Sequence, residues 1–430
     1  MLPVALGVII LLLAGTLALG LWVGVSLFYV GGISLMTFTS LPVERILGSV
    51  IWNNTSSSTL MALPLFIMMG EMLVKTRLSE DLFDGLSPWM ARLPGGLLHV
   101  NVVACALFAA ITGSVNATTA TVGKITIPEF EKRGYSDALS IGSLTASGTL
   151  GILIPPSMPM LIYGVVAQVS IGKLFMAGIV PGIGLMLLFS LYIAVVSLLD
   201  RKKESLEVPH FTWGQRLRSL PKILPVAALI VFVLGSIYTG WATPTEAAAI
   251  GVFGATFLAI VTGCLNWKIF WDCVKGTVRT NCMIMLILIG ASFFSVALGF
   301  LGLPKYISQS ILALGAGKYA IIALITLVYL FLGCLIDGYS MIVMTVPIFL
   351  PLITALGLDP IWFGIFVVIL VQIANITPPI GFNLFLVTGI CKHKIGFISK
   401  AVFPFIAMMV AFAFLMTFFP KVVLFLPNMM

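Results

Sequence analysis

The sequence predicts an all-α polytopic membrane protein with two inverted-topology repeats, each containing a re-entrant helical hairpin and a broken transmembrane helix. The chain is 60% apolar and 9% charged, with a mean hydropathy of +1.16, whereas soluble domains are about 25% charged. Apolar runs of about 18 residues or more, enough to span a bilayer, recur along the chain. Polar interruptions and proline-rich breaks recur at matching places in both halves.

Most of the apolar runs are expected to be complete crossings. The first, Leu2 to Leu19, has neither a basic flank nor a small-residue cleavage pattern, so we expect a retained span rather than a signal peptide. Segments 41–54 and 77–95 have mixed polarity and each holds a tryptophan, which predicts helices lying in the membrane interface. The predicted spans are 2–18, 20–37, 58–75, 137–168, 172–199, 221–239, 244–266, 278–300, 360–390 and 397–427.

Two further apolar stretches, 96–134 and 319–356, are interrupted halfway by polar residues. The interruptions read TGSVNATTA at 112–120 and GCLIDGYS at 333–340. The flanking pieces are short for a full crossing, so each stretch is predicted to be a re-entrant hairpin with a polar tip buried in protein. The alternative is two complete but short spans.

The positive charge of the chain is scattered through short loops. A net charge of +8 therefore favours membrane orientation over nucleic-acid binding. Segment 201–222 is rich in Lys and Arg and is predicted to be a solvated cytoplasmic connector, which places both termini on the outer side. The six cysteines show no CxxC spacing and the three histidines lie far apart, so neither a disulfide framework nor a metal site is indicated.

The two halves of the chain resemble each other. ITIPEF (125–130) matches MTVPIF (344–349), and ILIPPSMPMLIYG (152–164) matches NITPPIGFNLFLV (375–387), at an offset of about 220 residues. An odd number of predicted crossings separates the two starts, so the second half is expected to be inverted. Inverted repeats with hairpins and broken helices are typical of transporters whose site lies at the repeat interface.

The prolines explain why the helices would break. Pro155 and Pro156 are expected to leave the carbonyls of Gly151 and Ile152 without helical partners, since proline has no N–H and displaces the carbonyl four residues back. Free carbonyls suit a sodium ion, and the half-helix that follows presents its positive end to an anion. A simple proline kink is the alternative at either break taken alone.

Four motifs resemble the large membrane subunit of the tripartite ATP-independent periplasmic (TRAP) transporters, over nearly the whole chain. They are GSVNATTATVGKITIPEFEKRGY, IPPSMPMLIYG, ATPTEAAAIGV and NITPPIGFNLFL. The resemblance implies sodium-driven uptake, with two or more Na⁺ ions and no organic cofactor, of an organic acid such as sialic acid or a C4-dicarboxylate. It also implies two partners, a periplasmic binding protein and a small four-span membrane subunit, in the bacterial inner membrane with both termini periplasmic.

The resemblance further implies an elevator, in which hairpins and broken helices slide against a scaffold. The corresponding division of the chain is scaffold 1–95, transport 96–170, scaffold 171–300 with connector 201–220, transport 301–395 and the C-terminal span 396–430.

The family's ion and substrate sites transfer to particular positions of this sequence. The chain departs from many members at Ala117-Thr118, where they have Ala-Asp, and at Tyr339-Ser340, where they have Thr-Pro. The first sodium site falls on Ser114, Asn116, Gly148, Gly151 and Pro155, and the second on Gly333, Asp337, Asn375 and Thr377. Substrate contacts are expected from Thr118, Thr119, Lys124, Pro156, Pro379 and Asn383.

Several of these residues have a structural alternative. Asp337, a membrane-embedded acid near a hairpin tip, is expected to be functional but could cap a helix. Glu246 in TPTEAAA is as well explained as a helix N-cap partner of Thr243 as by transport. Lys124 could attract an anion or extend toward the cytoplasmic mouth, and Asn383 could bind substrate or bridge helices.

Two other classes of protein share some of these features. Ion channels also use re-entrant loops but usually assemble several identical filters, whereas this chain holds two inverted copies. A proton-coupled anion carrier is a further alternative. An enzyme is not expected, because HExxH, GxSxG and Walker A motifs are absent from the sequence, and GAGKY at 315–319 lacks the Ser or Thr that a P-loop needs.

Overall fold

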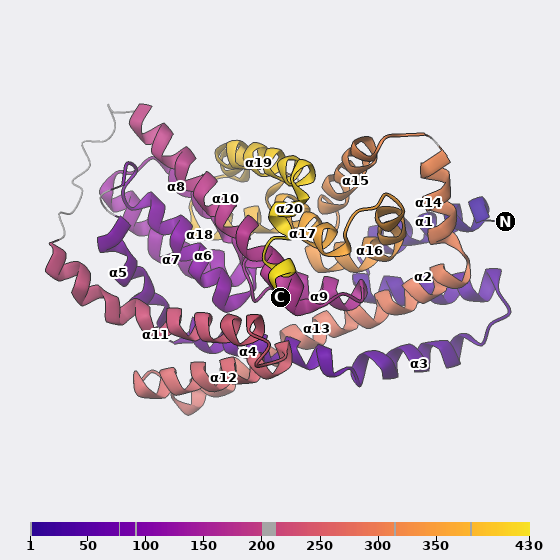
Figure 1. Ribbon diagram of the computed structural model, residues 1–430, viewed down its shortest axis with the longest axis horizontal. Helices are drawn as coiled ribbons and strands as arrows, with labels where there is room; N and C mark the ends of the chain where they lie inside the picture. The colour runs from indigo at the N-terminus through magenta and orange to yellow at the C-terminus, as the bar shows by residue number, and fades with distance from the viewer. Residues whose placement is uncertain (1, 77, 91–92, 200–211, 314, 379–380) are drawn as a thin grey trace.

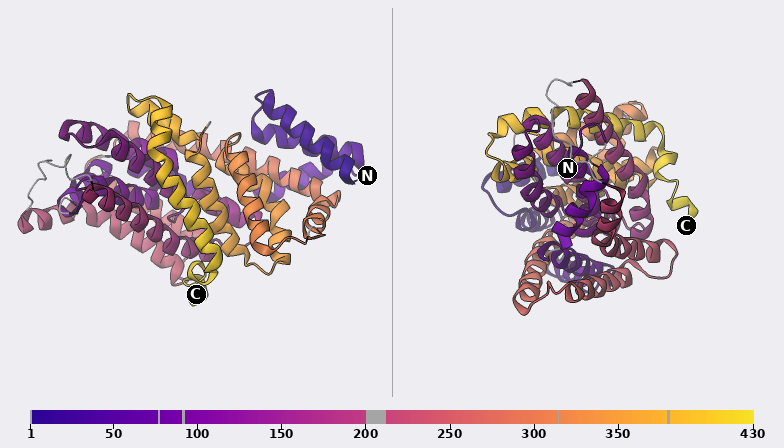
Figure 2. Two further views of the ribbon diagram at one scale, coloured as in Figure 1. Left: turned by 90° about the horizontal axis from the view of Figure 1, so that it is seen from above. Right: turned by 90° about the vertical axis from the view of Figure 1, so that its left-hand side faces the viewer.

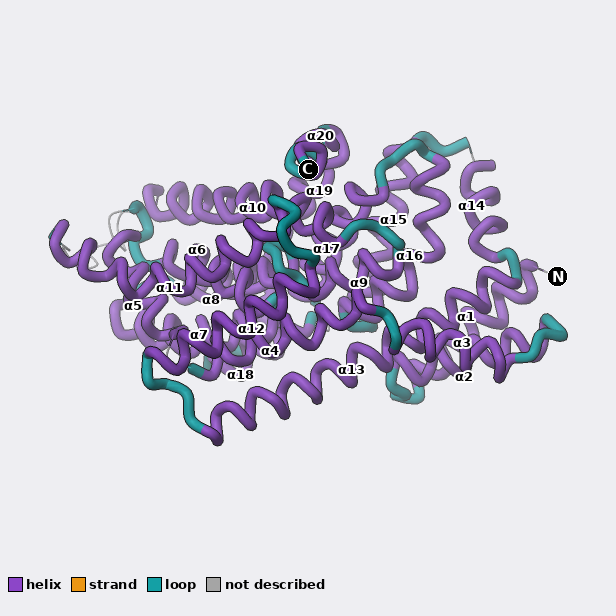
Figure 3. The backbone as a smooth tube through the Cα atoms, turned by 60° about the horizontal axis from the view of Figure 1, so that its bottom comes forward, coloured by secondary structure: helices purple, strands orange, loops and turns teal. Residues whose placement is uncertain are grey.

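The chain forms a bundle of helices, and no strand occurs in the part of it that the structure describes (Figure 3). The structure is a computed structural model, and it describes residues 2–76, 78–90, 93–199, 212–313, 315–378 and 381–430. The predicted all-α fold class is confirmed.

The helices follow one another with short connections. Those of the first half are α1 (Leu2–Ala18), α2 (Val23–Phe38), α3 (Val43–Thr55), η1 (Ser58–Met61), α4 (Ala62–Lys75), α5 (Leu78–Met90), α6 (Leu98–Thr112), α7 (Val115–Arg133), α8 (Asp137–Gly148), η2 (Thr149–Ile152), α9 (Met158–Val166) and α10 (Ile171–Leu199). Those of the second half are α11 (Trp213–Tyr238), α12 (Pro244–Val261), α13 (Trp267–Phe300), α14 (Leu303–Ala313), α15 (Lys318–Gly333), α16 (Gly338–Ala355), α17 (Pro360–Ile376), α18 (Phe382–Ile390), α19 (Ile395–Phe418), α20 (Pro420–Val423) and η3 (Pro427–Met429).

Seven helices in the described part of the chain are long and apolar enough to cross a membrane. This agrees with a multi-pass membrane protein, and shorter apolar helices such as α1, α2, α6, α15 and α17 add to the apolar bundle. The seven are Ser58–Lys75, Ile171–Leu199, Trp213–Tyr238, Pro244–Val261, Trp267–Phe300, Gly338–Ala355 and Ile395–Phe418.

The predicted connector 201–222 is wrong in its second part, which belongs to α11. Thr212 and Gln215 form a capping box that starts the helix at Trp213. Ser219 is buried against α5, where its hydroxyl accepts a hydrogen bond from the Trp89 indole at 3.1 Å and donates one to the Gly85 carbonyl at 3.0 Å. Residues 200–211 lie outside the described residues.

Other predicted boundaries also shift. The span predicted at 278–300 begins earlier, at Trp267, because the Asn266 side chain caps α13 by accepting from the Ile269 N–H at 2.8 Å. The span predicted at 397–427 ends at Phe418. Helices α3 and α5 form where mixed-polarity helices were predicted.

The order hairpin, broken helix, long helix occurs twice. Helices α6 and α7 form the first hairpin and are followed by α8, η2 and α9 and then by α10. Helices α15 and α16 form the second and are followed by α17 and α18 and then by α19. Each predicted broken helix is therefore confirmed as two helical pieces separated by a non-helical segment.

The two sets of elements meet in the middle of the molecule. Helices α1, α2, α3 and α14 gather at one end and α5, α7 and α8 at the other, with α9 and α17 between them (Figure 1). The C-terminal helix α19, yellow in Figure 2, crosses the middle and contacts both α8 and α17. Hairpin and break of one half thus pack against those of the other.

Helices α2 and α13 pack closely because glycines line their contact. A Cβ added at Gly290 would lie 2.4 Å from the Gly24 carbonyl oxygen, and one at Gly31 would lie 3.1 Å from the Phe293 ring. Close backbone approach through small residues is a main source of helix association in membranes. By contrast, a Cβ at Gly299 on the same helix meets open space.

We predict that Gly290→Ala destabilises the protein by about 1–3 kcal/mol, because the methyl group must push α2 away from α13. Gly299→Ala is the matched control and should be neutral or stabilising, since alanine is the better helix former. Thermal unfolding of the purified protein in detergent measures both. Equal midpoints for the two variants would show that the glycine contact does not hold α2 in place.

Candidate functional site

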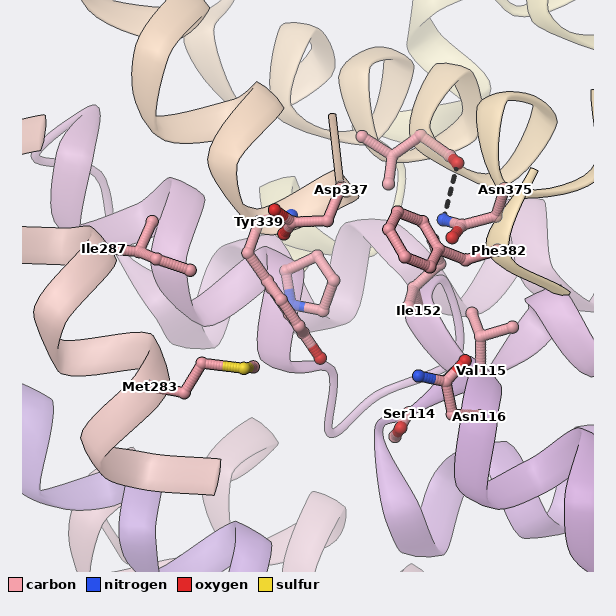
Figure 4. Close-up of a pocket in the computed structure, with 13 residues that line it drawn as sticks. Ser114, Val115, Asn116, Ile152, Met283, Ile287, Asp337, Tyr339, Asn375 and Phe382 are labelled. Atoms are coloured by element: carbon pink, nitrogen blue, oxygen red, sulfur yellow. Dashed lines mark hydrogen bonds between the residues drawn. The ribbon is translucent and has the colours of Figure 1, made fainter. Parts of the chain in front are cut away.

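A pocket of about 310 Å³ opens between the tips of the two hairpins (Figure 4). Residues from both tips, from both broken helices and from α13 line it, although they are far apart in the sequence. The lining residues are Ser114, Val115, Asn116, Ile152, Pro159, Met283, Ile287, Asp337, Gly338, Tyr339, Val371, Asn375 and Phe382. Four of the predicted ion-site residues, Ser114, Asn116, Asp337 and Asn375, therefore share one pocket.

The first tip is a tight turn between α6 and α7. Gly113 adopts a φ of +58°, and a Cβ there would lie 2.6 Å from the Pro156 carbonyl oxygen, so only glycine fits against the first break. The Thr112 hydroxyl lies 2.9 Å from that of Thr118 and accepts from the Ser114 N–H at 3.3 Å. These bonds fix the turn so that Ser114 and Asn116 face the pocket.

The first broken helix ends at Ile152 and resumes at Met158. The Ser157 side chain caps the second piece by accepting from the Met160 N–H, and its hydroxyl donates to the Ile152 carbonyl at 2.5 Å. The prediction that the Ile152 carbonyl is free is therefore wrong, because Ser157 supplies the missing donor. Pro155 and Pro156, joined by a cis peptide bond, are buried between the two pieces.

Two glycines let the first hairpin approach this break. A Cβ at Gly151 would lie 2.8 Å from the Ser114 carbonyl oxygen and 3.1 Å from the Thr118 hydroxyl. A Cβ at Gly148 would collide with the Thr119 hydroxyl at 1.9 Å. The structure thus brings together the residues predicted for the first ion site, with backbone and side-chain oxygens of α7 against the break.

The second tip is held by Asp337, which caps α16. Its carboxylate accepts from the backbone N–H groups of Tyr339 at 3.0 Å and Ser340 at 3.2 Å and from the Ser340 hydroxyl at 2.5 Å. The structural alternative considered for Asp337 is therefore confirmed, and the same residue also lines the pocket. Its negative charge lies at the positive end of the helix dipole.

The second broken helix ends at Ile376 and resumes at Phe382. The Asn375 amide donates to the Val371 carbonyl at 2.9 Å, and the Thr377 hydroxyl donates to the Ile373 carbonyl at 2.6 Å. A Cβ at Gly381 would lie 2.9 Å from both the Asn375 and Thr377 carbonyl oxygens, so the chain folds back tightly here. Pro379 lies outside the described residues.

The remaining predicted residues lie elsewhere. Gly333 packs against Ala374, where an added Cβ would collide with the alanine methyl at 2.2 Å, so its side of the helix is a contact rather than a ligand. Lys124 is exposed on α7 and does not line the pocket. Glu246 forms a capping box with Thr243, accepting from its N–H at 2.7 Å, which confirms the capping alternative.

Beside the pocket lies a buried polar pair, Thr119 and Asn383. The Asn383 amide donates to the Thr145 carbonyl at 2.7 Å, so this side chain bridges α18 and α8. The Thr119 hydroxyl and the Asn383 amide oxygen are buried without a hydrogen-bond partner. Both oxygens are therefore available to a bound ion or solute.

The donor set of the pocket fits a hard cation such as Na⁺. Ser114, Asn116 and Asn375 offer neutral oxygens and Asp337 offers one carboxylate, and such ligands suit alkali and alkaline-earth ions rather than soft metals. No cluster of three or more His, Cys, Asp and Glu residues occurs in the described part of the chain. The first residues of α7 and α16 also line the pocket, so two helix N-termini face it.

Sequence reasoning missed the apolar and aromatic walls of the pocket. In Figure 4, Tyr339 reaches from the Asp337 side toward Ser114 and Asn116, with Met283 of α13 nearby. Phe382, which begins α18, lies beside Asn375. Tyr339 could have been found from its place in the second tip, but α13 has no polar signal that marks Met283 and Ile287.

Comparison with known proteins gives a consistent result. The family model described as "Tripartite ATP-independent periplasmic transporter, DctM component" matches residues 9–422. The chain is 35% identical to the isethionate TRAP transporter permease protein DctMQ of Oleidesulfovibrio alaskensis over 96% of its own length and 65% of that protein's. It is 33% identical to the C4-dicarboxylate TRAP transporter large permease protein DctM of Pseudomonas aeruginosa over 93% and 92% of the two chains.

A third relative is the sialic acid TRAP transporter large permease protein SiaM of Vibrio cholerae, with 30% identity over 96% of each chain. Among solved structures, the Alcanivorax borkumensis YdaH transporter, described as having an unusual topology, resembles the chain with a TM-score of 0.65 and 15% identity, covering 95% of this chain and 99% of that one. The structural likeness shows a shared transporter fold.

We predict that Asp337→Ala lowers the free energy of unfolding by about 0.5–2 kcal/mol, whereas Asp337→Asn, which keeps a capping oxygen, changes it by a few tenths. Asp359 is a matched control, because it caps α17 by accepting from the Ile361 N–H at 2.7 Å and does not line the pocket. Thermal unfolding of all four Ala and Asn variants tests this. An Asp337→Asn loss as large as that of the alanine variant would mean that charge, not capping, holds α16.

Proposed function

Because this chain belongs to the DctM component family of the tripartite ATP-independent periplasmic transporters, we propose that it imports an organic acid together with sodium ions. Its relatives are permease subunits, and the chain is a multi-pass membrane subunit of a secondary transporter for organic acids. Sodium coupling, the elevator movement and the identity of the acid are our proposals. The observation that supports them best is the pocket between the two hairpin tips.

The electrostatics of the pocket favour an anion that enters with a cation. None of the pocket-lining residues in the described chain is a lysine or an arginine, so no fixed positive side chain faces a bound carboxylate. The helix N-termini of α7 and α16 supply partial positive charge, equivalent to about half an elementary charge each. Sodium ions bound beside the anion would supply the rest, which explains why the two would move together.

We assign the sodium ions to the polar edges of the pocket. The first site uses Ser114 and Asn116 with the backbone near Gly148 and Gly151, and the second uses Asp337 and Asn375 with the backbone near Thr377. The hairpin that carries each edge packs against a broken helix, as α7 does against α8 and α16 against α17. Binding at either edge would therefore draw a tip and a break together.

The substrate proposed is a small organic acid of the kinds named in the relatives, a C4-dicarboxylate or sialic acid, with isethionate added by the comparison. All three carry a carboxylate or sulfonate that can face the helix N-termini. Tyr339, Asn116 and Asn375 offer hydrogen bonds for further polar groups. Thr119 and Asn383 lie beside this space with free oxygens.

Movement of the site across the membrane follows from how the helices pack. We propose that α6–α9 and α15–α18 move as a unit, because α7 contacts α18 and α9 contacts both α16 and α17. Helices α2, α4, α11, α12 and α13 contact one another and would form the fixed scaffold. A periplasmic binding protein and a small membrane subunit are the proposed partners, and the name DctMQ of one relative is consistent with a large subunit joined to a small one.

We predict that Asn116→Ala or Ser114→Ala raises the sodium concentration needed for half-maximal uptake several-fold with little change in expression, because each removes one neutral oxygen ligand. Ser399→Ala, which loses a hydroxyl on α19 that donates to the Ile395 carbonyl at 2.8 Å, is the control. Radiolabelled organic-acid uptake into proteoliposomes over a range of sodium concentrations measures this.

Asp337 is the titratable group that makes proton coupling the alternative. Uptake driven equally well by a proton gradient in sodium-free buffer, and lost in Asp337→Asn, would support a proton-coupled carrier instead. Unchanged sodium dependence in both first-tip variants would reject their assignment as ligands.

We predict that the large subunit alone in liposomes takes up little solute, and that adding the small membrane subunit and the binding protein restores sodium-driven uptake. The physical reason is that the binding protein must deliver solute to a pocket with no cationic side chain to attract it. Reconstitution with each component omitted in turn is the measurement. Rapid uptake by the lone subunit would contradict the tripartite arrangement.

A further inference from the structure

One buried hydrogen bond joins the two broken helices directly. Gln372 of α17 is fully buried, and its Nε2 donates to the backbone carbonyl of Thr149 at 3.0 Å. The Thr149 hydroxyl is engaged elsewhere, donating to the Ala146 carbonyl at 2.7 Å. The contact is therefore between the Gln372 amide and the main chain of η2 alone.

The position of this bond is unusual for a packing contact. Thr149 lies between Gly148 and Gly151, the backbone of the first proposed ion site, and Gln372 lies one helical turn before Asn375 of the second. The two residues are 223 residues apart. The same offset aligns Ile152 with Asn375 in the matching segments of the two halves, so the bond joins corresponding positions.

The amide also costs stability. The Gln372 Oε1 atom is buried without a hydrogen-bond partner, and a buried acceptor left unpaired is unfavourable. The neighbours of Gln372 along α17 are Val371 and Ile373, both buried apolar residues, so an unbranched apolar side chain would suit this environment. Replacing a buried polar group by an apolar one of similar shape is often neutral or stabilising. Stability alone therefore does not account for a glutamine here.

We propose that Gln372 is a positioning residue that couples the two ion sites, an inference that rests on the proposed sodium-coupled function. When an ion draws the carbonyls near Gly148 and Gly151 inward, the Thr149 carbonyl moves with them. The amide of Gln372 transmits that displacement to α17 and so to Asn375. Occupation of one site then prepares the other, and sodium acts cooperatively.

The test is the sodium dependence of uptake by the complete transporter in proteoliposomes. In the unmodified protein the Hill coefficient for sodium should exceed 1. Gln372→Met keeps the length of the side chain and removes the donor, and it should lower the coefficient toward 1 while raising the half-saturating sodium concentration. A protein damaged only in packing would lose maximal rate without this change in cooperativity.

Asn101→Leu is a matched control. Asn101 is also fully buried, its amide donates to the Ser140 carbonyl at 3.2 Å, and its Oδ1 lacks a partner, but the bond joins α6 and α8 within one half. Its Hill coefficient should equal that of the unmodified protein. An equal fall in both variants, or an unchanged coefficient in Gln372→Met, would overturn the proposal.

A second variant and a second measurement guard against misfolding. Gln372→Asn keeps the amide but shortens its reach, and it should also lose cooperativity. Combining Asn116→Ala with Asn375→Ala should give non-additive shifts in sodium affinity with Gln372 present and additive shifts in Gln372→Met. If neither Gln372 variant yields folded complex, the residue is structural and the proposal fails.

The outcomes separate this inference from the proposed function. Uptake by the unmodified protein that is independent of sodium would reject sodium coupling itself. Uptake that needs sodium but shows a coefficient of 1, or one that no Gln372 variant changes, would leave sodium coupling in place and reject only the role of Gln372.

Discussion

The structure depends on one constraint, which is that a helix broken inside a membrane must have its freed backbone groups bound within the protein. Each break in this chain meets the requirement with nearby side chains. Ser157 binds the Ile152 carbonyl across the first break, Thr377 binds the Ile373 carbonyl at the second, and Gln372 binds Thr149 between them. The hairpin tips and the close packing of the two halves are what keep these groups away from lipid.

The same arrangement produces the chemistry of the site. Because each tip begins a helix beside a break, the pocket receives two helix N-termini together with the oxygens of Ser114, Asn116 and Asn375. Asp337 adds one carboxylate, which is already engaged as a cap. Such a site has partial positive charge for an anion and oxygen ligands for cations, and it has no fixed cation that would hold an anion after the ions leave.

Much of this could be predicted from the sequence because it depends on local patterns. Apolar runs, proline pairs and polar tips gave the broken helices, and the spacing of Thr243 and Glu246 is readable as a capping box. The starts of α11 and α13 were missed because single capping residues, Thr212 and Asn266, lie within polar stretches. The Gln372 bond and the apolar wall from α13 depend on tertiary contacts that no local pattern encodes.

The claim that sodium and organic acid occupy the site together is tested most directly by measuring both fluxes at once. Proteoliposomes containing the complete transporter would receive radioactive sodium and a radiolabelled organic acid, and the initial rate of entry of each would be recorded. The account predicts that the two enter in a fixed ratio with more than one sodium per solute, and that neither enters appreciably without the other. Rapid sodium entry without solute, as in a channel, or solute entry without sodium would contradict it.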